Sequence, residues 1–227
     1  MAVELRFKGF KCSEAKVARL MKDNGIRAQR KEHFKVTTDS KHNEPISPNL
    51  LNQDFKAEAP KRKWVSDLTY IWTLQGWLYL TIILDLFDRR IVGWVLSERM
   101  HSQVTTIAAL EDAVRREHPA PGLIFHSDQG KQYADKEFRK LLRKHKMVQS
   151  MSGKGNCYDN AVAESFFRTL KSELIYRITL ATRQAARLRI FEFIEITYNR
   201  FRRHSTLGYM SPVDFLNSYR KQSKNAA

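Results

Sequence analysis

The chain reads KWVSDLTYIWTLQGWLYLTIILDLFDRRIVGWVLS over residues 63–97. Apolar and polar residues alternate over 63–72, which is the period of a half-buried β-strand. After a turn at Gly76, residues 77–87 form a run rich in Ile, Leu and aromatic residues that predicts a buried strand, and a further strand is predicted over 91–97. Three consecutive strands joined by tight turns predict an antiparallel meander.

Helical and strand patterns alternate after this meander. The predicted elements are a helix whose apolar side runs from Val104 to Val114, a strand over 123–127, a helix over 135–145, a strand over 148–151, a helix over 159–177, a long amphipathic helix over 182–203 and a short helix from Ser211-Pro212. This order is typical of the α/β class. We expect a mixed five-stranded sheet flanked by helices, in which the later strands are parallel.

The two ends of the chain differ from this core. Residues 13–24 predict a short helix with Ser13 as its cap, either as the second half of a helix-turn-helix or as a plain helical appendage. Residues 36–60 are rich in Thr, Ser, Asn and Pro and predict a linker. We therefore divide the chain into a basic helical segment with its linker (1–60), a core (61–178) and a basic helical extension at the C-terminus (179–227).

The charge of the chain favours a polyanionic partner. Lys and Arg number 40 against 24 Asp and Glu, giving a net charge of +16. The excess lies in the flanks, because the middle of the chain holds 16 basic and 13 acidic residues over 64–177. Basic flanks most often bind nucleic acid, and the alternative is ordinary solvated basic surface. No apolar run is long enough to cross a bilayer, and the first ten residues lack the pattern of a secretory signal.

The two cysteines, Cys12 and Cys157, make neither a disulfide framework nor a zinc site. They fit a reducing cytosol, so we expect a cytoplasmic protein, and no membrane partner is expected.

Three acids stand in apolar or small-residue surroundings: Asp67 inside the first strand, Asp128 at the end of the fourth, and Glu164 early in the helix predicted over 159–177. If the first and fourth strands are neighbours, the two aspartates lie side by side, and the helix can present Glu164 to them. Singly, Asp67 could cap a bend, Asp128 could serve a turn, and Glu164 could pair with Arg168. Together, carboxylates need a positive partner, either a Lys or Arg or divalent metal ions.

Carboxylates without His or Cys partners suit Mg²⁺, or Mn²⁺ as its substitute, rather than zinc. Two such ions can activate a water or a 3′-hydroxyl and stabilise a leaving oxygen in phosphoryl transfer. The sequence therefore predicts a two-ion site made by Asp67, Asp128 and Glu164.

Three motifs surround these acids: Ser66-Asp67-Leu68-Thr69-Tyr70, His126-Ser127-Asp128-Gln129-Gly130 followed by Tyr133, and the run from Gly155 to Phe167 that contains Asn160 and Glu164. With 35 residues between the second and third acids, Lys171 seven positions after the third, and the ending Tyr198-Asn199-Arg200 … Arg203-His204-Ser205, the chain resembles the DDE transposases of bacterial insertion sequences, in the subgroup encoded in two frames. The resemblance covers about 60–220 and implies a bacterial, nucleoid-associated protein.

This resemblance implies a ribonuclease-H-like fold shared with the retroviral integrase core, with Asp67, Asp128 and Glu164 as catalytic Mg²⁺ ligands. It also implies cleavage at the ends of the element and joining of a 3′-hydroxyl to another phosphodiester. Lys171 would contact DNA near the scissile phosphate, and Asn160 would contact DNA or support the acids. The basic N-terminal segment resembles the tail of a longer helix-turn-helix region, so an upstream-frame partner or fusion is expected, as is a homo-oligomer that synapses two ends.

Further DNA contacts are expected from Arg168 on the stripe of Glu164, from Lys154 in a glycine-flanked loop, and from the adjacent pair Arg202 and Arg203. His126 is next to the second acid's motif, and we interpret it as a supporting contact rather than a general base. Four tryptophans fall at strand spacings and are predicted to lie in the core or to cover the sheet, although base stacking by one of them stays open: Trp64, Trp72, Trp77 and Trp94. Cys157 is interpreted as a packing residue.

Two other functions compete with the transposase. A non-catalytic DNA-binding regulator on a domesticated core would usually have lost an acid, and all three acids are present. A structure-specific nuclease of the same fold would cleave DNA but never join it.

Overall fold

The computed structural model describes residues 1–27, 44–153 and 157–225, and it divides the chain into two compact units, Met1–Phe34 and Lys35–Ala227. The smaller unit contains α1 (Ala2–Phe7) and α2 (Glu14–Asp23). Ser13 caps α2 by accepting a hydrogen bond from the Lys16 amide at 3.1 Å, which confirms the helix predicted there. The sequence interpretation did not anticipate α1.

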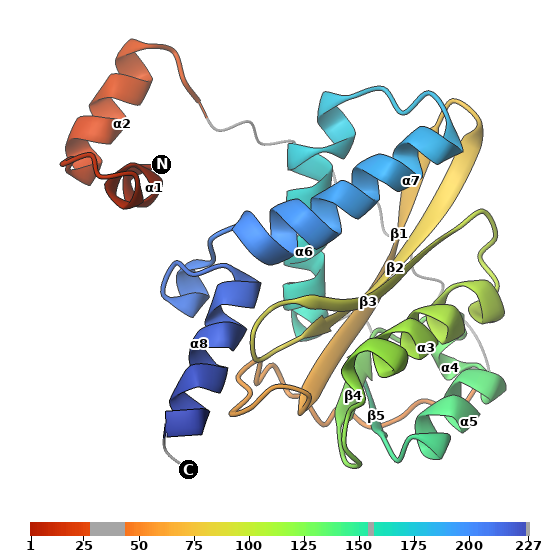
Figure 1. Ribbon diagram of the computed structural model, residues 1–227. Coiled ribbons are helices and arrows are strands. Elements are labelled where there is room, and N and C mark those ends of the chain that lie inside the picture. The colour runs from red at the N-terminus through yellow and green to blue at the C-terminus, as the bar shows by residue number, and fades with distance from the viewer. Residues whose placement is uncertain (28–43, 154–156, 226–227) are drawn as a thin grey trace. The chain divides into compact units, whose positions relative to one another are not determined.

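The larger unit is built on one five-stranded sheet with the order β3-β2-β1-β4-β5 (Figure 1). The strands are β1 (Lys63–Thr73), β2 (Gly76–Asp85), β3 (Ile91–Ser97), β4 (Ile124–Ser127) and β5 (Val148–Met151). β1, β2 and β3 are antiparallel neighbours, whereas β4 pairs with β1, and β5 with β4, in parallel. The mixed sheet and the predicted neighbourhood of the first and fourth strands are confirmed.

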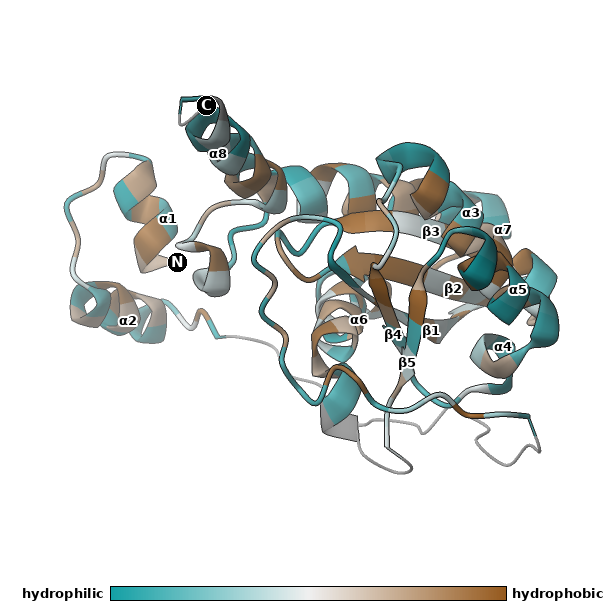
Figure 2. Ribbon diagram, turned by 90° about the horizontal axis from the view of Figure 1, so that it is seen from below, coloured by the Kyte–Doolittle hydropathy of each residue, from teal (hydrophilic) through white to brown (hydrophobic). Residues whose placement is uncertain are grey.

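Helices cover both faces of this sheet, because alternate side chains of each strand point to opposite faces. On one face α3 (Thr106–Glu117) and α5 (Lys136–Lys144) pack against Trp64, Ile83 and Val92. On the other face α6 (Ala161–Glu173) and α7 (Arg183–Phe191) pack against the inward residues of β1 and β2. Figure 2 shows the hydrophobic strands between helices whose outer surfaces are hydrophilic. A four-residue helix, α4 (Lys131–Ala134), follows β4.

Helix α6 is held by aromatic packing. The ring of Phe166 is 1% exposed and lies 4.8 Å from the ring of Tyr198, almost perpendicular to it. Full burial of such a side chain stabilises the fold by about 1.5–3 kcal/mol. The helix ends at Glu173, where a 3₁₀ turn over Ile175–Arg177 replaces the last turn that the sequence predicted.

The C-terminal part is integral to the larger unit. α7 continues into a π-helix (Glu192–Phe201), and α8 (Pro212–Asn225) follows. The Asn199 side chain accepts from the Ile91 amide at 2.9 Å and donates to the Ile91 carbonyl at 3.1 Å, so it occupies the hydrogen-bonding position of a strand neighbour. Ile190 and Ile194 are fully buried in the core. The boundary predicted between residues 178 and 179 therefore lies inside one compact unit, and the C-terminal extension is part of the core.

The boundary predicted at residue 60 also falls inside the larger unit. Leu51 is 1% exposed in the core, and the Leu50 amide donates to Ser150 Oγ at 2.9 Å. Residues 44–60 are thus a strap on the core, whereas the rest of the predicted linker lies outside the described residues. No helix in the described ranges has both the length and the apolar character needed to cross a membrane.

Candidate active site

Asp67 and Asp128 lie at the same level on two parallel neighbouring strands. Val65 of β1 is paired with His126 of β4, and each aspartate follows two residues later. Asp128 comes directly after the end of β4, where its Oδ1 accepts from the Gly130 amide at 2.9 Å. Burial, followed by the negative charge of Asp128, raises the pKa of the Asp67 carboxyl well above its ordinary value. The two carboxylates therefore lie within each other's field, as the sequence predicted.

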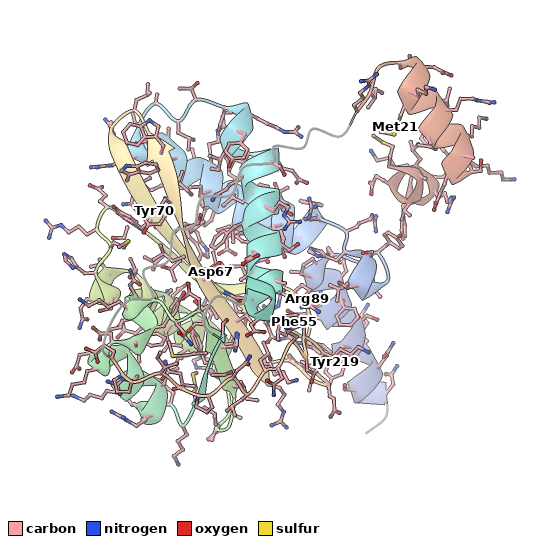
Figure 3. All side chains as sticks on the ribbon, turned by 180° about the vertical axis from the view of Figure 1, so that it is seen from behind. Met21, Phe55, Asp67, Tyr70, Arg89 and Tyr219 are labelled. Atoms are coloured by element: carbon pink, nitrogen blue, oxygen red, sulfur yellow. The ribbon has the colours of Figure 1, made fainter. Side chains whose placement is uncertain are left out.

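Glu164 joins them from α6, which packs on the face of the sheet that carries Asp67 (Figure 3). Burial raises the pKa of Glu164, the guanidinium of Arg168 lowers it, and the charge of Asp128 raises it. Glu164 in turn contributes to the raised pKa of Asp67. One strand, one strand end and one helix therefore gather three carboxylates that repel one another.

Lys171 lies two turns after Glu164 on the same side of α6. Burial lowers the pKa of its ammonium group, and attraction to Asp67 opposes that effect. The sequence interpretation directed Lys171 at DNA rather than at the acids. The structure shows that Lys171 lies in the field of Asp67, and its contact with DNA stays a prediction.

Asn160 fastens the start of α6 to β1. Its Nδ2 donates to the carbonyl of Ser66, the residue before Asp67, at 3.1 Å, and the side chain is 4% exposed. Its Oδ1 is buried without a hydrogen-bond partner. This burial argues against the DNA contact expected for Asn160 and favours the alternative, a supporting role beside the acids.

Tyr133 braces the same strand from the opposite face. Its hydroxyl lies 2.8 Å from Ser66 Oγ, which donates to the Ile82 carbonyl at 2.8 Å. Burial raises the pKa of Tyr133 well above its ordinary value, and the charges of Asp67 and Asp128 raise it further. Sequence reasoning quoted Tyr133 with the second motif but gave it no role. Its position in the helical segment directly after Asp128 was the available signal.

His126 is a buried structural residue. Its Nδ1 lies 2.8 Å from Ser150 Oγ and its Nε2 lies 3.2 Å from Ser152 Oγ, so both ring nitrogens join β4 to β5 and to the residue after it. Burial lowers its pKa to about 4, so the ring is neutral at physiological pH. These contacts hold the strand that ends in Asp128, in keeping with the predicted supporting role.

Asp159 is a further buried carboxylate, to which the sequence interpretation gave no role. It accepts from Asn49 Nδ2 at 2.9 Å, from Gln53 Nε2 at 3.1 Å and from the Gly153 amide at 2.8 Å. It therefore ties the strap to the start of α6, one residue before Asn160. Its place directly before Asn160 in the third motif was the only signal.

The remaining predicted DNA contacts are dispersed. Arg168 is exposed on α6 beside Glu164. Arg202 forms an ion pair with Glu173, and Arg203 Nη1 donates to the Tyr209 carbonyl at 3.1 Å, so both guanidiniums have partners within the chain. Lys154 lies outside the described residues, as do the side-chain surroundings of Cys157. The role of these residues at DNA stays a prediction.

The donor set fits a hard divalent cation. All three groups are carboxylates, and the raised pKa values of Asp67 and Glu164 show that positive charge between them would relieve an electrostatic cost. Across the described ranges, no group of three or more His, Cys, Asp or Glu side chains is close enough to form a metal-binding cluster. The three carboxylates therefore influence one another electrostatically, but they are not close enough together to surround a metal ion by themselves.

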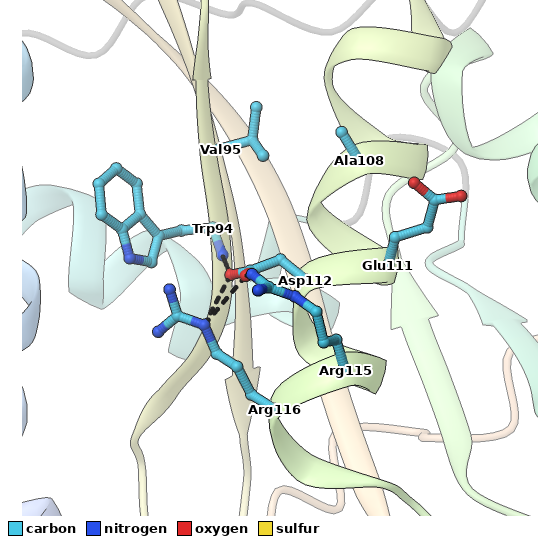
Figure 4. A pocket seen from close by; sticks show the side chains of 7 residues that line it. All are labelled: Trp94, Val95, Ala108, Glu111, Asp112, Arg115 and Arg116. Carbon is cyan, nitrogen blue, oxygen red and sulfur yellow. Dashed lines mark hydrogen bonds and ion pairs between the residues drawn. The ribbon is translucent and has the colours of Figure 1, made fainter.

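A pocket on the opposite edge of the sheet is separate from these acids (Figure 4). It lies between β3 and α3, and three of its charged side chains, Asp112, Arg115 and Arg116, pair with one another. Arg115 contacts Asp112 at 2.6 Å, and Arg116 contacts the same carboxylate at 2.9 Å. We place the chemistry at the acids instead, because the pocket offers no comparable concentration of like charge.

Comparisons with known proteins point to one family. Two family models, both described as integrase core domain, match residues 57–157 and 145–212. The Insertion element IS600 uncharacterized 31 kDa protein of Shigella sonnei is 44% identical over 223 residues, which cover 98% of this chain and 82% of that protein. Transposase InsF for insertion sequence IS3A of Escherichia coli (strain K12) is 41% identical over 214 residues, 94% of this chain and 74% of that protein.

Solved structures give the same fold. A chain of the simian T-cell lymphotropic virus intasome, in complex with PP2A regulatory subunit B56 gamma, superposes with a TM-score of 0.58 at 15% identity, over 90% of this chain and 70% of that chain. The HTLV-2 integrase catalytic core domain in complex with magnesium, in its trimeric form, superposes with a TM-score of 0.52 at 14% identity, over 70% of this chain and 98% of that chain. The fold is thus that of retroviral integrase cores, which is ribonuclease-H-like. The chain belongs to the insertion-sequence transposases with an integrase-like core, a family of polynucleotidyl transferases.

Proposed function

We propose that this protein cleaves DNA at the ends of an insertion element and joins the resulting 3′-hydroxyl to another phosphodiester, with Mg²⁺ as its cofactor. The observation that supports this most is the convergence of Asp67, Asp128 and Glu164 from β1, the end of β4 and α6. A cluster of carboxylates without His or Cys suits phosphoryl transfer assisted by metal ions, in which a water or a hydroxyl is the nucleophile.

In this proposal the three carboxylates would hold two divalent ions, which when bound would activate a water or 3′-hydroxyl and stabilise the leaving oxygen. The residues around them keep the carboxylates in place. Asn160 and Tyr133 fix β1 at Ser66, from opposite faces, immediately before Asp67. Because the pKa of Asp67 is raised, a proton competes with the cation for this carboxyl, and metal binding should weaken as the pH falls.

Lys171 would supply positive charge for a phosphate at the edge of the site. Its ammonium already lies in the field of Asp67, so a phosphate near the acids would also lie near Lys171. The exposed guanidinium of Arg168 is a further candidate on the same helix. Arg202 and Arg203 both have partners within the chain, so we propose that each would contact DNA only after it releases that partner.

The test is a joining assay with labelled element ends and Mg²⁺. Asp67→Asn, Asp128→Asn and Glu164→Gln are each expected to abolish cleavage and joining while DNA binding is kept. Glu173→Gln is a matched control, since Glu173 is a carboxylate on the same helix that pairs with Arg202 away from the acids. Retained joining in any one of the three acid variants would refute the assignment.

The same assay separates the competing functions. A regulator would bind the ends without cleaving them, and a nuclease would release cleaved ends without joined product. We expect joined product, whose amount depends on added Mg²⁺ and on all three acids.

We further propose that the active form is a homo-oligomer, because joining both ends of an element requires two sites held together. DNA affinity is expected to fall steeply with salt, with a slope near −0.9 per neutralised phosphate on duplex DNA. A flat salt response would contradict a role for the basic flanks. We also propose that a partner or fusion encoded in the upstream frame helps to bind the element ends. Specific binding of the ends by this chain alone would make that partner unnecessary.

A further inference from the structure

Two of the four tryptophans behave differently from the other two. Trp64 is fully buried in the core, and Trp94 is half-buried with its Nε1 donating to Glu195 at 2.8 Å. Trp72 and Trp77 instead are 53% and 47% exposed, although they face each other across the β1–β2 hairpin. Their spacing in the sequence predicted core positions or sheet cover for all four, and the exposure of Trp72 and Trp77 argues against a core position for these two.

These two tryptophans belong to an aromatic surface at the end of the hairpin, made by Tyr70, Trp72, Trp77 and Tyr79. Trp72 and Trp77 have ring centroids 4.9 Å apart, and Tyr70 lies 6.2 Å from Trp77 and 5.2 Å from Tyr79. All three pairs meet edge to face, at 68°, 85° and 70°. The rings are therefore not stacked flat on one another, which leaves ring faces for another flat group.

The aromatic surface occupies one face of the hairpin only. The side chains between its members, including Ile71, Leu78 and Leu80, are at most 1% exposed and pack in the core beneath α6 and α7. Exposed aromatic surface on a sheet is costly in water and commonly marks a binding site.

The aromatic surface belongs to the strand that carries Asp67, but its rings lie on the other face of the sheet. Tyr70 lies three residues after Asp67 on β1, and Figure 3 shows both residues on the same strand, with Tyr70 nearer the hairpin turn. The charge of Asp128 contributes to the raised pKa of Tyr70, so the phenol lies within the field of the second acid. The acids and the aromatic rings therefore lie on opposite faces of β1, and DNA would reach both by passing around the edge of β1 beyond Val65, where the pairing with β4 ends.

The loop after β3 adds positive charge beside this surface. The Tyr70 hydroxyl contacts Met100 Sδ at 3.0 Å, and Met100 is flanked by the exposed basic side chains Arg99 and His101. Flat apolar rings next to basic groups are the combination that binds single-stranded nucleic acid, in which bases stack and phosphates pair with cations.

We propose that the aromatic surface of the β1–β2 hairpin binds unpaired bases of the DNA strand that enters the acid site, by stacking on Trp72 and Trp77. The bases must be unpaired, because within a duplex the faces of each base are already covered by its neighbours. This inference rests on the proposed function only in taking DNA as the substrate. Its consequence is a preference for element ends that are frayed or opened over ends that are fully paired.

The test compares two DNA duplexes that share one sequence, one blunt and one with three unpaired terminal nucleotides, bound in EDTA so that no chemistry occurs. We expect the wild-type chain to bind the frayed duplex more tightly. Trp72→Ala with Trp77→Ala should reduce affinity for the frayed duplex by about tenfold or more and leave affinity for the blunt duplex unchanged. Trp72→Phe with Trp77→Phe should keep most of the preference, since a flat ring remains.

Phe191→Ala is the matched control, because Phe191 is as exposed as Trp77 (47%) and contacts another ring, but lies on α7. Asp67→Asn is included so that the two proposals fail separately. It should lose joining and keep the preference for frayed ends. Equal binding of both duplexes by the wild type, or an unchanged preference in the double alanine variant, would overturn the inference.

A photo-crosslink on the wild-type chain covers the case in which the double variant does not fold. With 5-iodouracil at the unpaired positions, crosslinks should map to the peptide that contains Trp72 or Trp77, and crosslinks elsewhere would overturn the inference. If the double variant kept DNA affinity and instead lost self-association in sedimentation, the surface would contact a second copy of the chain, which would also overturn it.

Discussion

Replacing Asn160 tests how the acids are held in place. In the structure its Nδ2 donates to the Ser66 carbonyl at 3.1 Å, and this bond joins the start of α6, which carries Glu164, to the strand that carries Asp67. Asn160→Ala removes this donor and leaves a buried carbonyl oxygen with one partner fewer. Asn160→Asp keeps the shape but places a carboxyl oxygen against the same carbonyl.

The expected cost follows from these contacts. Loss of a hydrogen bond to a buried group costs about 1–3 kcal/mol. Part of this is offset, because the alanine also removes the Oδ1 atom, which is buried without a partner. We therefore expect Asn160→Ala to lower the free energy of unfolding by about 1–2 kcal/mol, or the melting temperature by about 2–8 °C for a chain of this size. Asn160→Asp should cost more at neutral pH, since it adds negative charge beside Asp67.

The assay is thermal unfolding without metal, together with joining rate and DNA affinity at a temperature where each variant is folded. We expect both variants to join DNA more slowly than the wild type, with little change in DNA affinity, because the acids lose their alignment. A variant with wild-type stability and weakened DNA binding would refute this reasoning and restore Asn160 as a DNA contact.

Three further predictions follow from the packing and the charges. Asp67→Asn should raise the melting temperature of the metal-free protein near pH 8. The pKa of Asp67 is raised, so its ionisation at high pH destabilises the folded state, and asparagine cannot ionise. This gain in melting temperature should shrink when Mg²⁺ is added to both proteins. The pKa of His126 is lowered from 6.5 to about 4, so the stability that its neutral ring contributes is complete above pH 6.5 and is lost as the pH falls through 4. Chemical denaturation should show that His126→Asn removes up to about 3 kcal/mol of this loss of stability at low pH. The pH–rate profile above pH 6.5 should not change. Gly93→Ala should destabilise the chain by about 1–3 kcal/mol in the same measurement, since its Cβ would lie 2.6 Å from Ala113 Cβ and 2.7 Å from the Ala109 carbonyl oxygen of α3; an unchanged stability would show that α3 can shift away from β3.

The sheet and the three acids could be predicted because their signals are local. The alternation over 63–72 and the apolar run after Gly76 specify a hairpin by themselves, and both are confirmed as β1 and β2. The parallel pairing of β1 and β4 needs only the order of the elements and was expected from it. The proximity of Asp67, Asp128 and Glu164 then follows from the fold.

The features that the sequence did not reveal depend on contacts between distant segments. Residues 44–60 have the composition of a linker, yet Leu51 fills a position in the core and Asp159, more than a hundred residues away, binds the strap. The period of two places Trp72 and Trp77 on a sheet face but does not say where the helix that covers this face ends. The partners of Arg202 likewise come from the end of α6, which no local pattern reveals.

The most direct measurement is Mn²⁺ binding to the protein–DNA complex, with DNA that ends in a 2′,3′-dideoxynucleotide so that joining cannot proceed. Electron paramagnetic resonance of free Mn²⁺ would give the number of ions bound by the wild-type chain, by Asp67→Asn, Asp128→Asn and Glu164→Gln, and by the control Glu173→Gln. We expect the wild type and the control to bind two ions and each acid variant to lose at least one. Binding of two ions by all of the acid variants would contradict the assignment of these carboxylates as the metal ligands.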